Sequence, residues 1–184
     1  MASHFAIQHA AHQIRLGGVI IYPTETVYGL GCDPMNFDAI NYLNQLKQRD
    51  SSKGLILLAD NLERFNGYIE TLSDEQKAQL NQTKQATSWI VSASHSLPDW
   101  LSNSQRTVAI RVSPHPVVKQ LCQHLGHPII STSANPSGMK TCQNALQAHK
   151  YFHDKVDAFL IDAQPLNGQA STIKRLDNLS TIRP

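Results

Sequence analysis

Short, uninterrupted apolar runs recur along this sequence, and the segments between them have the spacing of amphipathic helices. Such runs are typical of strands buried on both faces of a sheet, because a strand with one wet face alternates polar and apolar residues. We predict strands at residues 19–22, 55–59, 88–92, 107–112, 128–132 and 156–161, and a further short strand at 171–174. The pattern indicates an α/β fold in which helices flank a mostly buried sheet.

Helix signals fill the intervals between these runs. We predict helices at residues 38–46, 73–83, 116–125 and 144–152, and an amphipathic helix near the N-terminus with Ser3 as its N-cap. We find no internal repeat and no linker long enough to divide the chain, so we expect residues 1–184 to form a single domain. Ligands of such sheets bind where strand ends and loops converge.

Composition argues against several classes of protein. The formal net charge is only +2, so affinity for an anion must come from a local cluster of cations. Three cysteines without a CxxC pair indicate a reducing compartment, and we expect a cytoplasmic protein. Residues 1–18 lack the long apolar core of a signal peptide or a membrane span, and the scattered histidines predict no metal site.

The stretch YPTETVYGLG, residues 22–31, places hydroxyl groups, one carboxylate and two glycines directly after a predicted buried strand. Its glycines lack the spacing of a dinucleotide-binding loop, and the chain contains no GxxxxGK[ST] phosphate loop. If this protein handles a nucleotide, it must therefore use another device.

Three cations, Lys47, Arg49 and Lys53, follow the helix predicted at 38–46. Lys47 and Arg49 can converge only if the helix ends between them, because positions i and i+2 lie on different faces. Together the three could clamp a polyphosphate, with the arginine gripping two oxygens. The alternative is a solvated helix end whose cations complement the helix dipole, and the motif taken alone favours this second interpretation.

Two further motifs place polar groups at apolar strands. In STSANPSG, the side chains of Ser131, Ser133 and Asn135 point to one side of an extended segment, which mildly favours binding over a plain Asn-Pro turn. Arg111 lies inside a predicted strand, where it needs an anion supplied either by a carboxylate of the protein or by a ligand. No nucleophile–base pair is evident, so the residues suit the binding and orientation of an anionic substrate.

Taken in order, these motifs resemble the YrdC-like family, and within it the short bacterial threonylcarbamoyl-AMP synthases. The resemblance rests on YPTETVYGLG, KQR with the following KGL, TVAIRV ahead of HP, STSANPSG and STI, and extends from about Gly18 to about Lys174. It implies an open, twisted α/β sheet around a concave basic groove. The implied reaction converts L-threonine, bicarbonate or CO2, and ATP into threonylcarbamoyl-AMP and pyrophosphate, without a tightly bound cofactor and with Mg2+ carried by ATP.

The resemblance also implies roles for single residues. Catalytic roles are implied for Lys47, Arg49, Ser133 and Asn135. Threonine binding is implied for Thr24, Tyr28, Arg111 and Ser171, and nucleotide contacts for Lys53, Thr107 and Ser131. The segment 29–31 is implied to let the backbone approach the ligand. Many members have proline where this chain has Asp50, and longer members have a histidine near Leu57 and Leu58.

The implied partners are proteins that pass the threonylcarbamoyl group to the adenosine beside the anticodon of tRNAs reading codons that start with A. Two alternatives stay open. A basic groove could bind tRNA or double-stranded RNA without turnover, although the low net charge and the lack of an aromatic basic strand argue against it. YrdC-like domains also occur in large carbamoyl-transfer proteins of hydrogenase maturation, where carbamoyl phosphate replaces threonine and bicarbonate.

Overall fold

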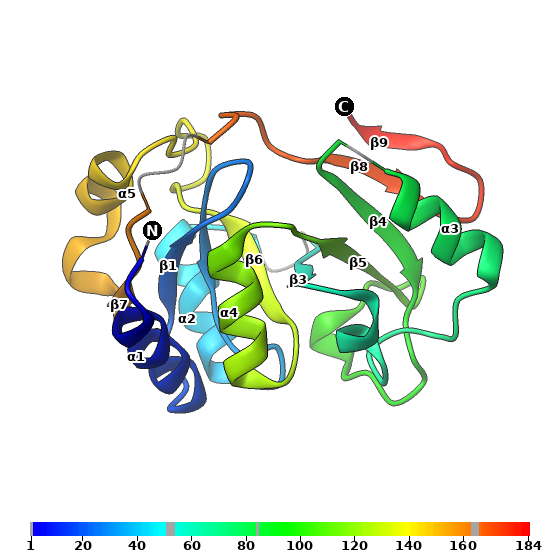
Figure 1. Ribbon diagram of the computed structural model, residues 1–184, viewed down its shortest axis with the longest axis horizontal. Coiled ribbons are helices and arrows are strands. Elements are labelled where there is room, and N and C mark those ends of the chain that lie inside the picture. The colour runs from blue at the N-terminus through cyan, green and yellow to red at the C-terminus, as the bar shows by residue number, and fades with distance from the viewer. Residues whose placement is uncertain (1, 51–53, 84, 163–165) are drawn as a thin grey trace.

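The computed structural model describes residues 2–50, 54–83, 85–162 and 166–184. Within these ranges, nine strands form one mixed sheet in the order β7-β1-β2-β6-β3-β5-β4-β8-β9 (Figure 1). The strands are β1 (Ile20–Pro23), β2 (Tyr28–Gly31), β3 (Ile56–Ala59), β4 (Thr87–Ser92), β5 (Thr107–Val112), β6 (Ile129–Ser133), β7 (Ala158–Phe159), β8 (Thr172–Arg175) and β9 (Thr181–Arg183). The pairs β1–β7, β3–β5 and β4–β8 are parallel, and the other pairs are antiparallel.

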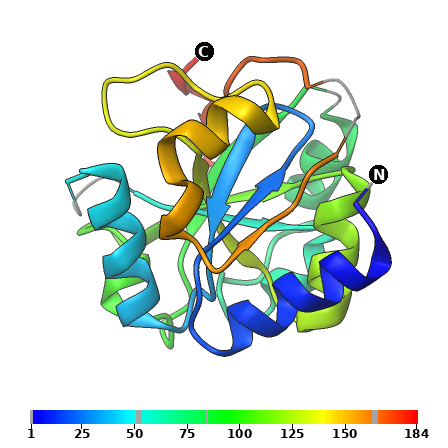
Figure 2. The same ribbon diagram turned by 90° about the vertical axis from the view of Figure 1, so that its left-hand side faces the viewer.

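Helices cover both faces of this sheet. The α-helices of the described ranges are α1 (His4–Arg15), α2 (Phe37–Lys47), α3 (Asp74–Gln82), α4 (Pro116–Leu125) and α5 (Ala145–Phe152), and short 3-10 helices are η1 (Leu62–Phe65), η2 (Asp99–Leu101) and η3 (His153–Lys155). Helices α1 and α4 lie on one side of the strands and α2 on the other (Figure 2). The predicted N-cap Ser3 is confirmed at the start of α1, and Ser73 forms a capping box with Gln76 at the start of α3.

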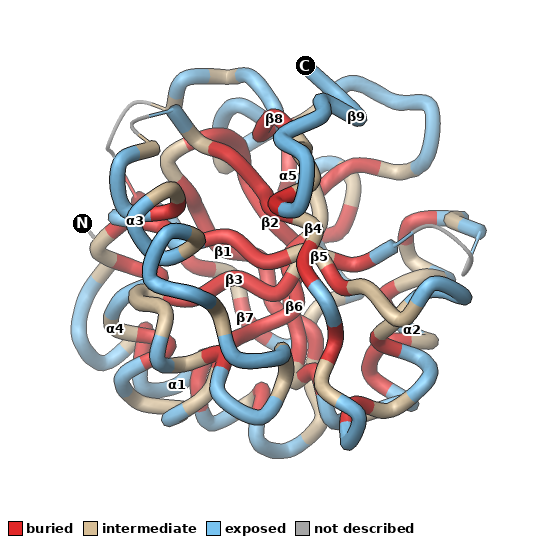
Figure 3. Tube along the Cα trace, turned by 90° about the vertical axis from the view of Figure 1, so that its right-hand side faces the viewer, coloured by how far each residue is buried: buried red, intermediate tan, exposed pale blue. Residues whose placement is uncertain are grey.

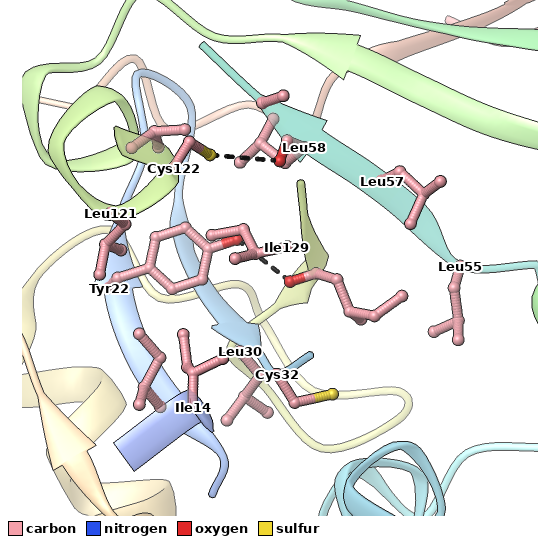
Figure 4. Packing of buried hydrophobic residues seen from close by; sticks show 14 of the residues in the cluster. Ile14, Tyr22, Leu30, Cys32, Leu55, Leu57, Leu58, Leu121, Cys122 and Ile129 are labelled. Atoms are coloured by element: carbon pink, nitrogen blue, oxygen red, sulfur yellow. Dashed lines mark hydrogen bonds between the residues drawn. The ribbon is translucent and has the colours of Figure 1, made fainter. Parts of the chain in front are cut away.

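The main apolar core lies between the sheet and helices α1 and α4. Tyr22 of β1 packs among Leu121 and Cys122 of α4 and Ile129 of β6 (Figure 4). Its hydroxyl donates to the carbonyl of Ile130 at 3.4 Å, so the polar end of this buried ring is satisfied. Buried residues concentrate along the strands, whereas the outward faces of the helices are exposed (Figure 3). This packing fixes β1 and β6, whose ends carry the motifs of interest.

The structure confirms the predicted α/β fold. Every predicted strand and helix is present, with ends that differ from the prediction by no more than two residues. Two strands were not predicted from the sequence. Residues 29–31 were expected only to let the backbone approach a ligand, yet they belong to strand β2, which pairs with β1 as a hairpin in which Pro23 faces Tyr28. Strand β9 is a three-residue edge strand against β8.

Candidate active site

A cavity of about 1100 Å³ opens on the α2 side of the sheet. One wall is a stripe along α2, and its members recur at helical spacing: Phe37, Ile40, Asn41, Asn44 and Lys47. Side chains of β3, β4, β5, β8 and β9 form the floor. The lining extends in sequence from Thr24 to Arg183, so residues far apart in the chain contribute to the same cavity.

The end of α2 brings Lys47 and Arg49 together. The C-cap residue Gln48 adopts the left-handed conformation, with φ 49° and ψ 46°, so the chain turns between the two cations. Both side chains consequently line the cavity. The sequence required the helix to end between them for convergence, and α2 ends at Lys47.

Both cations are tied to the end of β6. The ammonium group of Lys47 donates to the carbonyls of Ser133 and Asn135, the latter at 2.7 Å. The guanidinium of Arg49 donates to Thr132 Oγ1 at 3.0 Å and to the carbonyl of Gly54 at 2.6 Å. The positive charges are thereby fixed at one end of the cavity, beside the hydroxyl groups of STSANPSG.

The polar residues after β6 line the cavity as the alternation of STSANPSG indicated. Ser131, Ser133 and Asn135 all contribute to the lining, and Thr132 does so as well. The amide of Asn135 donates to the carbonyls of Pro136 and Met139, at 3.0 and 2.7 Å, which shapes the turn. Its Oδ1 atom is buried without a hydrogen-bond partner and is an unused acceptor.

The loop between β1 and β2 closes on its own hydroxyl groups. Thr24 Oγ1 donates to the carbonyl of Val27 at 2.8 Å and accepts from the backbone N–H groups of Thr26 and Val27 at 3.2 and 3.3 Å. Thr24, Thr26 and Val27 line the cavity, whereas Glu25 does not. The loop therefore presents a pre-shaped surface rather than a flexible one.

Arg111 lies on the floor of the cavity in β5, with 5% of its side chain exposed. Its Nε atom is 3.6 Å from Glu25 Oε1, and its Nη1 atom donates to Thr26 Oγ1 at 3.3 Å. Of the two sources of negative charge left open by the sequence, the protein thus supplies one. A ligand anion can add to it, because Arg111 also reaches the cavity.

Gly29 and Gly31 serve different purposes. Gly29 lines the cavity, and a Cβ atom there would lie 3.3 Å from Cζ of Tyr22 and 3.5 Å from Ser131 Oγ. A Cβ atom at Gly31 would lie 2.5 Å from the carbonyl oxygen of Ile130 and 2.7 Å from Cε1 of Tyr22. Gly31 is therefore required by packing inside the sheet, whereas Gly29 is the one of the two glycines that lines the cavity.

The remaining predicted site residues divide into three groups. Thr107 and Ser171 line the cavity, and Ser171 Oγ lies 2.9 Å from Ser88 Oγ. Tyr28 does not line it: the ring is buried beside Phe159, and its hydroxyl lies 3.4 Å from the carbonyl oxygen of Asp162. Lys53 lies outside the described residues.

Arg183 lines the cavity from β9 and was not predicted from the sequence. Its Nη2 atom donates to the carbonyl of Ser171 at 2.7 Å. The only signal was a single arginine in TIRP, and a three-residue edge strand has no periodicity that could assign it to the sheet. Phe37 and Trp100 also border the cavity, with ring centroids 5.4 Å apart.

Positive charge dominates this cavity. Within the described part of the chain, four cations line it: Lys47, Arg49, Arg111 and Arg183. Burial, with a contribution from Arg49, lowers the pKa of Lys47 to about 8. Burial also lowers the pKa of Arg49 and of Arg183, and each is further lowered by a neighbouring arginine. An anionic ligand would relieve this mutual repulsion.

Acidic groups contribute little to the described lining. Asp99 is the one acidic residue there, and its side chain is 99% exposed and paired with Arg106 at 3.0 Å. Among the described residues, no three His, Cys, Asp or Glu side chains are placed to hold a metal ion together. No helix in those ranges is both long and apolar enough to cross a membrane.

Comparison with known proteins agrees with this geometry. The chain is 42% identical to a protein of Pseudomonas putida strain F1 and 43% identical to one of Pseudomonas aeruginosa strain UCBPP-PA14, each named threonylcarbamoyl-AMP synthase, and each alignment covers 100% of both chains. The structure of P. abyssi Sua5 complexed with L-threonine matches with a TM-score of 0.88 at 25% identity, over 97% of this chain and 53% of that one. This chain thus spans about half the length of P. abyssi Sua5.

A second solved structure shows the same fold. E. coli YciO matches with a TM-score of 0.87 at 24% identity, over 98% of this chain and 89% of that one. The model of the Sua5/YciO/YrdC family, described as telomere recombination, matches residues 12–184. With most of its length matched by the family model and its whole length aligned to the curated relatives, this chain belongs to the Sua5/YciO/YrdC family.

Proposed function

We propose that this protein is a threonylcarbamoyl-AMP synthase, which joins L-threonine, CO2 or bicarbonate, and ATP and releases pyrophosphate. One observation carries the proposal: four cations converge on a hydroxyl-lined cavity in a chain that is 42% identical, over its whole length, to a protein of that name. A zwitterionic amino acid and a polyphosphate are both ligands that such a cavity would hold.

The reaction needs positioning and charge stabilisation more than covalent catalysis. The threonine amine attacks the carbon of CO2, and loss of a proton leaves an N-carboxylate. One oxygen of this carbamate attacks the α-phosphorus of ATP, and the bond to the bridging oxygen breaks so that pyrophosphate leaves with the electron pair. Negative charge develops on the phosphoryl oxygens, where fixed cations and N–H donors stabilise it.

The residues of the cavity would contact different parts of the substrates according to their position. Lys47, Arg49 and Arg183 would face the phosphates, with the hydroxyls of Ser131 and Ser133 beside them. Arg111 would pair with the threonine carboxylate. Threonine would also contact the loop of Thr24 and the hydroxyl of Ser171, and the nucleotide would extend towards Thr107. Asn135 would orient the reacting groups through its free Oδ1.

Two predicted residues, Tyr28 and Lys53, are not part of the described lining of the cavity. Tyr28 would support the threonine site from behind the cavity, because its ring lies in the core. The cations and hydroxyls of the described lining fit phosphates rather than a metal ion, so Mg2+ would arrive on ATP, and Lys53 would join the phosphate contacts. We further propose a cytoplasmic enzyme whose product is passed to proteins that modify tRNA.

The test measures pyrophosphate release from ATP and bicarbonate, with and without L-threonine. We expect release to depend on threonine in the wild type and to fall by about a hundredfold in Lys47→Ala, because a fixed cation at the phosphates is lost. Lys119→Ala, at an exposed position of α4, is the matched control and should retain wild-type release. Mass spectrometry should identify threonylcarbamoyl-AMP as the second product.

Two results would contradict the proposal. Folded wild-type protein that releases pyrophosphate equally with and without threonine would show that the amino acid is not a substrate. Turnover of carbamoyl phosphate in place of threonine and bicarbonate would move the chain to carbamoyl-transfer chemistry.

A further inference from the structure

Glu25 sits in the middle of the loop that lines the cavity, yet its own side chain points away from the cavity. Thr24 and Thr26, on either side of it, both contribute to the lining. The Glu25 side chain is only 22% exposed, and it extends towards β5. The Glu25 carboxylate is not needed to contact an anionic substrate. The residues that it contacts therefore indicate its function.

The Glu25 carboxylate contacts one residue of β5 and one residue of the segment that follows this strand. Oε1 lies 3.6 Å from Nε of Arg111, and Oε2 accepts a hydrogen bond from the hydroxyl of Ser113. The same Ser113 hydroxyl accepts from the backbone N–H of His115, the N-cap of α4. The carboxylate is therefore anchored on one side, and its other oxygen faces the arginine.

The contact between Glu25 and Arg111 is the main interaction that compensates for the burial of the guanidinium charge. Arg111 Nε and Glu25 Oε1 are both buried atoms without a hydrogen-bond partner, so the interaction between them is the charge contact itself. Burying a guanidinium without a counter-charge is costly. The Nη1 atom donates to Thr26 Oγ1, on the cavity side of the same loop. Glu25 and Thr26 thus hold the guanidinium from two neighbouring positions.

From this arrangement we infer that Glu25 is a positioning residue for the amino-acid substrate. It holds Arg111 from behind, so that the guanidinium offers its Nη edge to the carboxylate of threonine. Glu25 itself does not touch the substrate. The inference rests on the proposed function, because it takes threonine as the ligand of Arg111. It also explains why a carboxylate belongs in a loop that otherwise supplies hydroxyl groups to an anion-binding cavity.

The test compares the binding of L-threonine and of ATP by titration calorimetry. In Glu25→Gln, which keeps the shape of the side chain and removes its charge, we expect the dissociation constant for threonine to rise by roughly tenfold or more. The dissociation constant for ATP should stay within about twofold of the wild-type value, since the phosphates bind at the Lys47 end. A merely structural role would weaken both ligands together.

Three further variants make the outcome specific. Glu25→Asp retains the charge and should recover part of the threonine affinity, and it serves as the second variant if Glu25→Gln does not fold. In an Arg111→Ala background, Glu25→Gln should have no further effect on threonine binding, because its target is gone. Glu63→Gln, an exposed carboxylate in η1, should behave as the wild type.

The outcomes separate the inference from the proposed function. Wild type that binds no threonine overturns both. Wild type that binds threonine, with unchanged affinity in Glu25→Gln or with additive effects in the Arg111→Ala background, overturns the inference alone. Selective loss of threonine affinity, partial recovery in Glu25→Asp and non-additivity with Arg111→Ala would together establish Glu25 as a positioning residue.

Discussion

His115 shows how a single buried side chain makes the fold sensitive to pH. Its ring is 3% exposed, and its Nδ1 atom accepts from the backbone N–H of Val117 at the start of α4. The neutral ring therefore carries its proton on Nε2, which lies 4.0 Å from Asp162 Oδ2. Burial lowers the pKa of His115, although Asp162 and Glu25 act in the opposite direction.

We predict that the free energy of unfolding falls as the pH drops below about 6.5, the pKa of an unfolded histidine. The unfolded chain takes up a proton in this range while the folded ring stays neutral, so the slope disappears once the pH is below the folded pKa. Urea unfolding of the wild type and of His115→Asn, which can still cap α4, measures this. The slope should weaken in His115→Asn and persist in His95→Asn, whose ring is exposed. Equal slopes in both would assign the effect to other groups.

At the residue scale, the sequence predicted which side chains line the cavity better than it predicted their partners. Lys47, Arg49, Ser133 and Asn135 were identified as a set, and all four line the cavity. The partner of Arg111 could not be identified, because Glu25 lies in a distant loop and only the sheet brings the two together. A pairing of that kind depends on tertiary contacts that no local pattern encodes.

Strand β2 carries two glycines that local patterns cannot distinguish. In the structure, a Cβ atom at Gly31 would meet the carbonyl oxygen of Ile130 at 2.5 Å, whereas one at Gly29 would lie 3.3 Å from Cζ of Tyr22 and 3.5 Å from Ser131 Oγ. A backbone carbonyl opposes the Cβ atom at Gly31, whereas side-chain atoms are the nearest neighbours of the Cβ atom at Gly29. The two glycines should therefore respond differently to the same substitution.

We predict that Gly31→Ala lowers the free energy of unfolding by about 1–3 kcal/mol, as overpacking against rigid neighbours does. Gly29→Ala should lower stability less, because the atoms nearest to its methyl group are side-chain atoms of Tyr22 and Ser131, at 3.3 Å or more. Chemical denaturation of both variants measures the difference. Equal loss of stability in both variants would contradict the distinct roles assigned to the two glycines.

Strands and helices with a clear apolar or capping pattern were predicted well. The two strands that were missed, β2 and β9, have physical reasons. The apolar runs and the capping signals located seven strands and five helices. β2 was missed because glycine has low strand propensity and suggested a loop. β9 was missed because three residues are too few for a period, and its pairing with β8 depends on a turn rather than on its own sequence.

At the scale of the whole molecule, the cavity is completed by the C-terminal strand. We predict that Arg183→Ala raises the KM for ATP by roughly tenfold, because one of the cations assigned to the phosphates is lost. The thermal unfolding midpoint should move little, since Arg183 donates a single hydrogen bond, to Ser171, in the structure. Arg175→Ala is the matched control, because Arg175 pairs with Asp177 away from the cavity. An unchanged KM in Arg183→Ala would exclude a phosphate role for it.

The overall architecture could be predicted because the apolar runs and the helical segments between them indicated the same fold. The buried strands required helices on both faces, and the helical segments were found between them. The order of the nine strands did not follow, because mixed parallel and antiparallel pairing is decided by crossover connections and long-range packing.

The parallel pairs between distant strands also limit when the sheet can be completed during synthesis. Strand β1 pairs with β7 through Ile20 and Ala158, and β4 pairs with β8 through Thr87 and Thr172. During synthesis the earlier strand of each pair leaves the ribosome long before its partner, with an unpaired edge exposed to other chains. Because Ser171 and Arg183 are synthesised after most of the lining, a nascent chain that lacks them has no complete cavity. Substrates can therefore stabilise the chain only after these residues have joined the sheet.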